Sequence, residues 1–105
     1  MGCPTEINIG DDLVFSITTH DPDTGILTNA DAAPTYRIYE NEGGAAIMNG
    51  VMAALDPVHT TGFYTETIAC TVANGFHEGM NYTIYVEATV GGDTGGITFT
   101  FRTTE

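Results

Sequence analysis

Few side chains in this sequence of 105 residues could act as catalytic nucleophiles. Ser16 is the only serine, and it lies in an alternating stretch without the glycine-flanked turn that exposes a catalytic serine. Cys70 has the parity of a buried strand residue, and Cys3 is close to the N-terminus. The first residues show neither the basic stretch nor the apolar run of a signal peptide. We therefore expect two free thiols, with a Cys3–Cys70 disulfide as the alternative.

The histidines and the inward-facing acids also lack a catalytic or zinc-binding pattern. His20, His59 and His77 fall in three separate predicted loops, and none has a second histidine or cysteine within four positions. Glu66 is the one acidic residue whose strand parity points inward. A bulge or a strand end would bring its carboxylate to water, whereas full burial would make it a candidate catalytic acid. We expect no enzymatic activity and no cofactor.

The acidic loops are the better candidates for metal binding, because hard cations such as Ca²⁺ prefer carboxylate oxygens. Asp21, Asp23 and Asp31 flank one predicted loop, and we name them as candidate calcium ligands. The alternative is purely structural. Asp-Pro-Asp-Thr-Gly over 21–25 has the residue types of a tight turn, and it lacks the spacing of a calcium loop that a glutamate closes.

The charge balance excludes two classes of partner. The chain carries 14 acidic residues against 2 arginines and no lysine, which gives a formal net charge of -12. Nucleic-acid binding requires cations that displace counterions from phosphates, and an anionic membrane surface would repel this chain. No apolar stretch approaches the roughly 20 residues of a transmembrane helix. We therefore expect neither nucleic acid nor a membrane among its partners.

Short stretches in which polar and apolar residues alternate recur along the whole chain, separated by turn residues. This spacing is typical of an all-β sandwich or barrel. The predicted strands cover 5–9, 13–19, 35–40, 45–55, 63–71, 80–90 and 97–103. The fourth is a strand or a hairpin that turns at Asn49-Gly50, and 72–79 holds a helical turn. About seven antiparallel strands in one domain, residues 1–105, indicate an immunoglobulin-like β-sandwich.

The apolar faces of these strands supply the predicted core. Tyr82 stands near the start of the sixth strand, where the hydroxyl of a tyrosine corner would bond back to the upstream backbone. An ordinary core tyrosine is the alternative. The predicted core consists of Leu13, Phe15, Ile17, Tyr36, Ile38, Ile68, Ile84, Val86, Ala88, Val90, Ile97, Phe99 and Phe101.

Three strand patterns in the chain carry a resemblance. They are Pro-Thr-Tyr-Arg-Ile-Tyr-Glu over 34–40, Gly-Phe-Tyr over 62–64 and Gly-Met-Asn-Tyr-Thr-Ile-Tyr-Val over 79–86. In these patterns the chain resembles small immunoglobulin-like domain proteins that are encoded beside the capsid and tail genes of tailed bacteriophages. The resemblance implies a virion structural component that is assembled in the host cytoplasm, with capsid or tail proteins, or copies of itself, as partners. It implies no catalytic residue.

The register of the last hairpin decides which residues share the outer face of a sheet. We assume that strands 35–40, 80–90 and 97–103 are neighbours in one sheet. If the hairpin is centred between Asp93 and Thr94, Arg102 lies opposite Tyr85. Both arginines of the chain then share one surface with two tyrosines.

This surface is the candidate contact site, and it consists of Arg37, Tyr39, Tyr85, Glu87 and Arg102. Tyrosine and arginine are enriched at the centres of protein–protein contacts. The alternative is cross-strand pairing within the sheet, with arginine stacked on tyrosine or bridged to glutamate, which stabilises a sheet by about 0.2–1 kcal/mol per pair.

The sequence favours a non-enzymatic virion structural component, such as a capsid decoration or head–tail accessory protein. It would act by docking and self-assembly, through one sheet face or by strand addition at an open edge. The alternative is an immunoglobulin-like module that binds carbohydrate or a cell-surface ligand through loops at one end. Those loops carry Asp, Gly and His, with Phe76 as the only clear aromatic residue.

Overall fold

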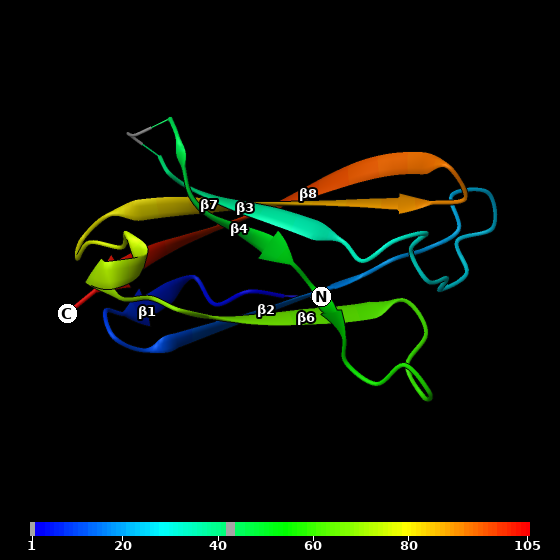
Figure 1. Ribbon diagram of the computed structural model, residues 1–105, viewed down its shortest axis with the longest axis horizontal. Coiled ribbons are helices and arrows are strands. Elements are labelled where there is room, and N and C mark those ends of the chain that lie inside the picture. Colours follow the sequence, from blue (N-terminus) through cyan, green and yellow to red (C-terminus); the bar gives the residue numbers. More distant parts are fainter. Residues whose placement is uncertain (1, 42–43) are drawn as a thin grey trace.

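Two β-sheets face each other in the computed structural model, which describes residues 2–41 and 44–105 (Figure 1). The larger sheet has the strand order β1-β8-β7-β3-β4, and the smaller one has the order β2-β6-β5. The strands are β1 (Glu6–Asn8), β2 (Asp12–Thr18), β3 (Thr35–Glu40), β4 (Ala46–Val51), β5 (Ala53–Ala54), β6 (Phe63–Ala69), β7 (Asn81–Val90) and β8 (Asp93–Thr104). The predicted all-β class is confirmed, and so is the helical turn within 72–79, which is the 3-10 helix η1 (Val72–Asn74).

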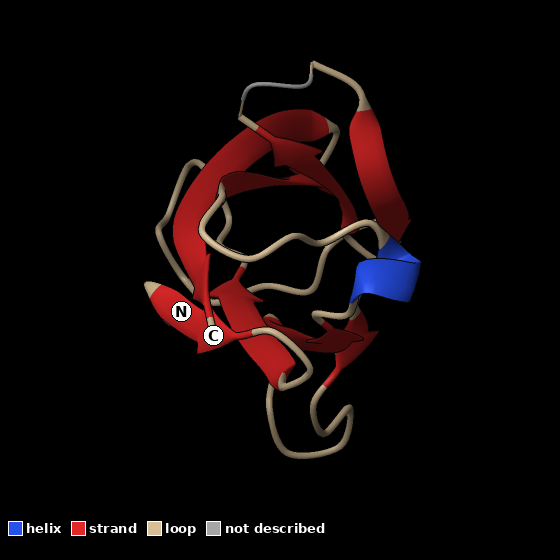
Figure 2. Cartoon of the chain, turned by 90° about the vertical axis from the view of Figure 1, so that its left-hand side faces the viewer, coloured by secondary structure: helices blue, strands red, loops and turns tan. Residues whose placement is uncertain are grey.

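The larger sheet is mixed rather than purely antiparallel. Figure 2 shows the molecule from one end, with the strands arranged around a common interior. Most neighbouring strands are antiparallel, but β1 runs parallel to β8, with Glu6 opposite Arg102. The prediction of antiparallel strands alone is therefore wrong at this edge. Parallel neighbours cannot be joined by a tight turn, and here the rest of the sandwich connects β1 to β8. The described part of the chain holds no helix with the length and apolar character of a membrane span.

The segment 45–55 forms two strands that belong to different sheets. Strand β4 runs straight through Asn49 and Gly50 as the partner of β3, and the chain then crosses at Met52 to β5 in the smaller sheet. The alternative prediction of a hairpin that turns at Asn49-Gly50 is therefore wrong. Gly50 lies opposite Tyr36, and a Cβ atom at Gly50 would come within 2.7 Å of the Tyr36 hydroxyl. The glycine serves this close approach of a ring and does not form a turn.

The hairpin between β7 and β8 has a tighter turn than the sequence suggested. Only Gly91 and Gly92 separate the paired residues Val90 and Asp93. Both glycines have positive φ values, 57° and 85°, as a two-residue type I′ turn requires. Strand β8 therefore begins at Asp93, and the predicted centre between Asp93 and Thr94 is wrong.

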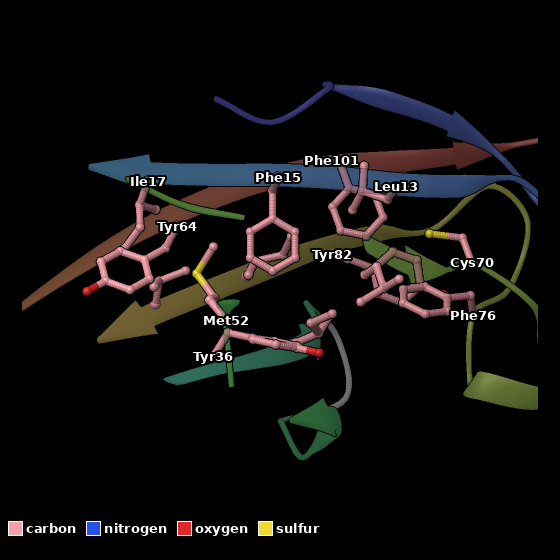
Figure 3. Packing of buried hydrophobic residues seen from close by; sticks show 14 residues of the cluster. Leu13, Phe15, Ile17, Tyr36, Met52, Tyr64, Cys70, Phe76, Tyr82 and Phe101 are labelled. Carbon is pink, nitrogen blue, oxygen red and sulfur yellow. The ribbon is translucent and has the colours of Figure 1, made fainter. Parts of the chain in front are cut away.

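The core between the sheets is rich in aromatic rings (Figure 3). Phe15 of β2 meets Tyr36 of β3 edge to face, with ring centroids 5.3 Å apart. Most of the predicted core residues are buried, but Ala88, Ile97 and Phe99 are only partly buried. Ile97 and Phe99 lie on the part of β8 that β1 does not flank. Cys70 is buried, as its parity predicted, and Tyr82 is buried as well. The structure adds three buried residues that the sequence analysis did not place in the core: Met52, Tyr64 and Phe76.

Tyr82 forms the predicted hydrogen bonds to the upstream backbone. Its hydroxyl accepts the N–H of His77 at 2.6 Å and donates to the His77 carbonyl at 3.3 Å. The ring of Tyr82 stacks on Phe101 and contacts Phe76, with centroids 5.4 and 5.0 Å apart. The tyrosine therefore ties the loop before β7 to the core of the sandwich.

Replacing Tyr82 by phenylalanine tests this bracing. We expect Tyr82→Phe to lower the free energy of unfolding by about 1–3 kcal/mol, because the His77 N–H loses its partner in a partly buried position. Urea-induced unfolding followed by circular dichroism measures the change. Tyr39→Phe, at a partly exposed position, is the control and should change stability by no more than about 0.5 kcal/mol. Equal effects of the two substitutions would contradict the bracing role.

Candidate functional site

The outer face of the larger sheet brings four of the predicted contact residues together. Arg37 of β3 lies directly opposite Tyr85 of β7, and Glu87 lies opposite Thr35. Tyr39 is two positions from Arg37 on the same strand. Because alternate side chains of a strand point to opposite faces, all of these side chains face away from the core. We call Arg37, Tyr39, Tyr85 and Glu87 the outer-face cluster.

Arg102 does not join this cluster. Tyr85 lies opposite Thr98, and Arg102 lies opposite Asn81. The predicted pairing of Arg102 with Tyr85 is wrong by four positions along β8, because the hairpin turns at Gly91-Gly92. Because the shift is an even number of residues, Arg102 keeps the same orientation and still faces outward. At about 3.3 Å per residue it lies roughly 13 Å along the strand from Thr98.

The outer-face cluster surrounds a hollow of about 280 Å³, which Thr35 and Tyr36 also line. Tyr85 lies across Gly96 of β8, where a Cβ atom would come within 2.5 Å of the tyrosine hydroxyl. The glycine thus allows the ring to lie flat on the sheet, as aromatic residues do beside edge glycines. The Tyr85 hydroxyl approaches Oε2 of Glu87 at 3.4 Å. Tyr85 is nevertheless 37% exposed to solvent.

Neither arginine is neutralised within the described chain. Among residues 2–41 and 44–105, the ion pair recorded is His59 with Asp56 at 2.9 Å, and no ring stacks on a guanidinium. The structure therefore does not show the alternative, in which an arginine stacks on a tyrosine or pairs with a glutamate within the sheet. Arg37 is an exposed cation beside two tyrosines in a protein of net charge -12.

Glu66 and Tyr36 form a polar contact between the two sheets. The Tyr36 hydroxyl donates to Oε2 of Glu66 at 3.0 Å, and the Thr67 N–H donates to Oε1 at 3.0 Å. Glu66 faces Phe15 across β2 and β6 but is only half-buried. Burial raises the pKa of Tyr36 from 10.0 to about 12, and the hydrogen bond and the negative charge of Glu66 add to the rise.

The cysteines are free thiols, as the sequence predicted. Burial raises the pKa of Cys3 from 9.0 to about 11. Burial also raises the pKa of Cys70 from 9.0 to about 11, and the negative charges of Cys3, Asp12 and Asp11 add to this rise. Because the thiolate is the reactive form, both groups are poor nucleophiles at neutral pH.

Two of the candidate calcium ligands are engaged by backbone N–H groups. Asp21 Oδ1 accepts the N–H groups of Asp23 and Thr24 at 2.8 and 3.2 Å, which is the turn geometry that the alternative interpretation expected. Asp31 accepts the N–H groups at both turn positions of the β7–β8 hairpin, at 3.0 and 2.9 Å. The described residues contain no group of three or more His, Cys, Asp or Glu that could hold a metal ion.

Two residues have positions that the sequence did not reveal. Phe76, the predicted loop aromatic, is fully buried against Tyr82 and Phe101, so it does not serve a loop binding site. Asp31 connects the loop before β3 to the turn at Gly91-Gly92. The glycine pair signalled the turn, but nothing in the sequence indicated that Asp31 would accept its N–H groups.

Comparison with known proteins supplies no relative for this chain. No family model matches it, and neither the curated proteins nor the solved structures give a match.

The raised pKa values predict a loss of stability in alkaline solution. In the unfolded chain the thiols lose protons near pH 9 and tyrosine near pH 10, whereas the folded chain holds these protons up to about 11 and 12. The free energy of unfolding should therefore fall as the pH rises from 9 to 12. Urea unfolding at a series of pH values measures this fall. Tyr36→Phe should keep the cysteine contribution and lose the part between pH 10 and 12. A stability that is flat across this range would contradict the assignment.

Calcium binding is the second measurable point. We expect millimolar CaCl₂ to leave the melting temperature unchanged and to give no heat in a calorimetric titration, because Asp21 and Asp31 already accept backbone N–H groups. MgCl₂ at the same ionic strength is the control. A calcium-specific rise in melting temperature that Asp31→Asn removes would contradict this expectation.

Proposed function

We propose that this protein is a non-enzymatic docking module that binds another protein through the outer-face cluster. The observation that carries the proposal is the position of Arg37. It is exposed, it has no ion-pair partner among the described residues, and it lies directly opposite Tyr85 and two positions from Tyr39. With 14 acidic residues and only 2 arginines in the chain, a cation grouped with two tyrosines distinguishes this face from the rest of the surface.

The chemistry of the cluster suits a protein partner. Tyrosine rings bury a large area with little loss of side-chain freedom, and the planar guanidinium pairs with a carboxylate through two parallel hydrogen bonds. A partner that places a carboxylate over Arg37 and a flat apolar group over Tyr85 would satisfy both. Away from this face, the acidic surfaces of identical copies repel one another, with screening over about 8 Å at physiological salt. The protein would stay dispersed until it meets a complementary surface.

We propose that the sandwich is of the immunoglobulin type. Strands β2, β6 and β5 correspond to the B, E and D strands of that fold, and β8, β7 and β3 correspond to G, F and C, with β4 as an added strand beside C. The hydrogen bonds of Tyr82 to the backbone of His77 correspond to the tyrosine corner. Strand order and corner together support this assignment.

We further propose that the docking serves a virion, with the protein as a capsid decoration or head–tail accessory component. Capsid or tail proteins, or further copies of the chain, would be the partners. The support is the resemblance of segments 34–40, 62–64 and 79–86 to the small phage-encoded domains. The alternative of carbohydrate binding by end loops is less favoured, because its one aromatic residue, Phe76, lies in the core.

The double substitution Tyr39→Ser with Tyr85→Ser tests the docking face. We expect the wild-type protein in purified virus particles in a fixed copy number by quantitative mass spectrometry. The double variant should be lost from the particles at least about tenfold, because it removes both rings beside Arg37. It should stay folded, since exposed cross-strand contacts contribute only about 0.2–1 kcal/mol each.

A matched control replaces exposed apolar residues away from this face. Val58→Ser with Val72→Ser alters side chains that are 82% and 62% exposed, and it should leave incorporation unchanged. Full incorporation of the tyrosine variant would disprove docking through the outer-face cluster. Binding to a glycan array that the tyrosine variant loses would assign the same face to carbohydrate instead.

A further inference from the structure

One edge of the larger sheet is open along most of β8. Strand β1 pairs only with Arg102, Thr103 and Thr104, and the neighbouring residues Thr5 and Ile9 bond to the same part of β8. No described residue pairs with this edge of β8 before Arg102. The backbone N–H of Arg102 donates to the Thr5 carbonyl at 2.9 Å, away from β7. In an antiparallel ladder, residues of the same parity point their backbone groups to the same side. The even-numbered residues that precede Arg102 therefore present their backbone groups to the open edge.

Four residues of β8 offer such groups: Thr94, Gly96, Thr98 and Thr100. This stretch contains no charge, no proline and no bulge, although sheet proteins commonly use these features to protect an edge strand from pairing. The unprotected stretch is long enough to pair with a short extended peptide.

The facing edge of β2 is open at the same end of the sandwich. Gly2 and Ser16 exchange two backbone hydrogen bonds of 3.0 and 2.9 Å. Thr18 has the same parity as Ser16, and its backbone N–H and C=O have no backbone partner among the residues described. We call the gap between this end of β2 and the stretch Thr94–Thr100 of β8 the seam.

The seam leads into an apolar hollow of about 300 Å³. Ile17 of β2, Val86 and Ala88 of β7 and Ile97 of β8 line it. Ala88 and Ile97 are two of the three predicted core residues that remain partly exposed, because no strand closes the sandwich here. An apolar side chain inserted from outside would complete their burial.

The charges around the seam select the occupant. Asp93 lines the hollow, and Asp21 lies between two residues that also line it. The chain has no lysine, and both of its arginines lie outside the hollow lining. A second copy with a net charge of -12 would be repelled. Charge complementarity therefore favours a basic segment of a different protein.

We propose that the seam binds an extended segment of another protein, which adds a strand to the edge of β8. The segment has apolar side chains at alternate positions, which enter the hollow, and lysine or arginine beside them, which face the acidic rim. It follows the line of β1 and Gly2, parallel to β8 and antiparallel to β2. Main-chain hydrogen bonds give affinity in this mode, and the hollow gives specificity. The seam uses the backbone edge of β8, whereas the outer-face cluster uses side chains of β3 and β7, of which Tyr85 lies opposite Thr98. The proposal does not depend on docking through that cluster.

The probe is a synthetic peptide of alternating valine and threonine with lysine at both ends. We expect it to bind the full chain and to shift the amide NMR signals of Thr94, Gly96, Thr98 and Thr100. In a control peptide, N-methyl groups replace the amide hydrogens along the edge that would face β8. This peptide keeps its side chains but cannot pair with β8, so it should not bind. A version with glutamate in place of lysine should bind at least about tenfold more weakly, because the rim is acidic.

Thr98→Pro is the decisive variant. The Thr98 N–H points to the open edge and not to β7, so proline is compatible with the β7–β8 ladder but blocks strand addition. We expect Thr98→Pro to weaken binding of the lysine-flanked peptide by about tenfold or more. Thr98→Val, which keeps the N–H, should bind the peptide normally. Ala88→Leu fills the hollow and should weaken binding in the same way, so the proposal stays testable if the proline variant unfolds.

The outcomes separate the seam from the other surfaces. The variant Tyr39→Ser, which alters the outer-face cluster at a residue of β3 away from β8, should bind the peptide as the wild type does, whether or not it enters particles. If the wild type binds no lysine-flanked peptide, or if the shifts centre on Arg37 and Tyr39 of β3, the proposal is wrong. If sedimentation shows dimers of the chain that Thr98→Pro abolishes, the occupant is a second copy, and the assignment to a basic partner is wrong.

Discussion

The contact of Phe15 with Tyr36 is the interaction on which the two-layer arrangement depends. The two rings come from different sheets and meet edge to face, and Phe99 adds a third ring beside Phe15 at 6.4 Å. Each such ring buries about 150–250 Å². Since Tyr36 must point inward, its neighbours on the strand must point outward, and this places Arg37 on the surface. Gly50 leaves the space that the inward ring requires.

The surface that results divides into a face and an edge with different chemistry. The face holds an arginine and two tyrosines, and it suits a folded partner with a fixed shape. The edge offers unpaired backbone groups and an apolar interior, and it suits a chain without fixed structure of its own. Both are set in a strongly acidic molecule, whose negative field attracts positively charged groups and repels acidic ones. The raised pKa values of the thiols make both cysteines poor nucleophiles at neutral pH.

Alternation predicted the strands and most of the core, because a period of two leaves little choice where one face is buried. It also predicted that Arg37, Tyr39, Tyr85 and Glu87 share a face, since parity alone decides this. The position of Arg102 could not be predicted in the same way. The glycine-rich run 91–96 offers several places for a turn, and each moves β8 along β7 without changing parity. Phe76 was expected to be an exposed loop residue. A loop has no repeating pattern of polar and apolar residues, so nothing in its neighbours reveals that its ring turns inward.

The parallel pairing of β1 with β8 has a mechanical consequence. The two strands lie near opposite ends of the sequence and run in the same direction, with Glu6, Ile7 and Asn8 opposite Arg102, Thr103 and Thr104. Tension applied through the two ends would pull these strands past each other along their length. The hydrogen bonds between them would then share the load together and would not open one after another, as they do when a hairpin is pulled from its open end. Pulled in this way, β1 and β8 would be loaded in shear, so their hydrogen bonds would have to break together.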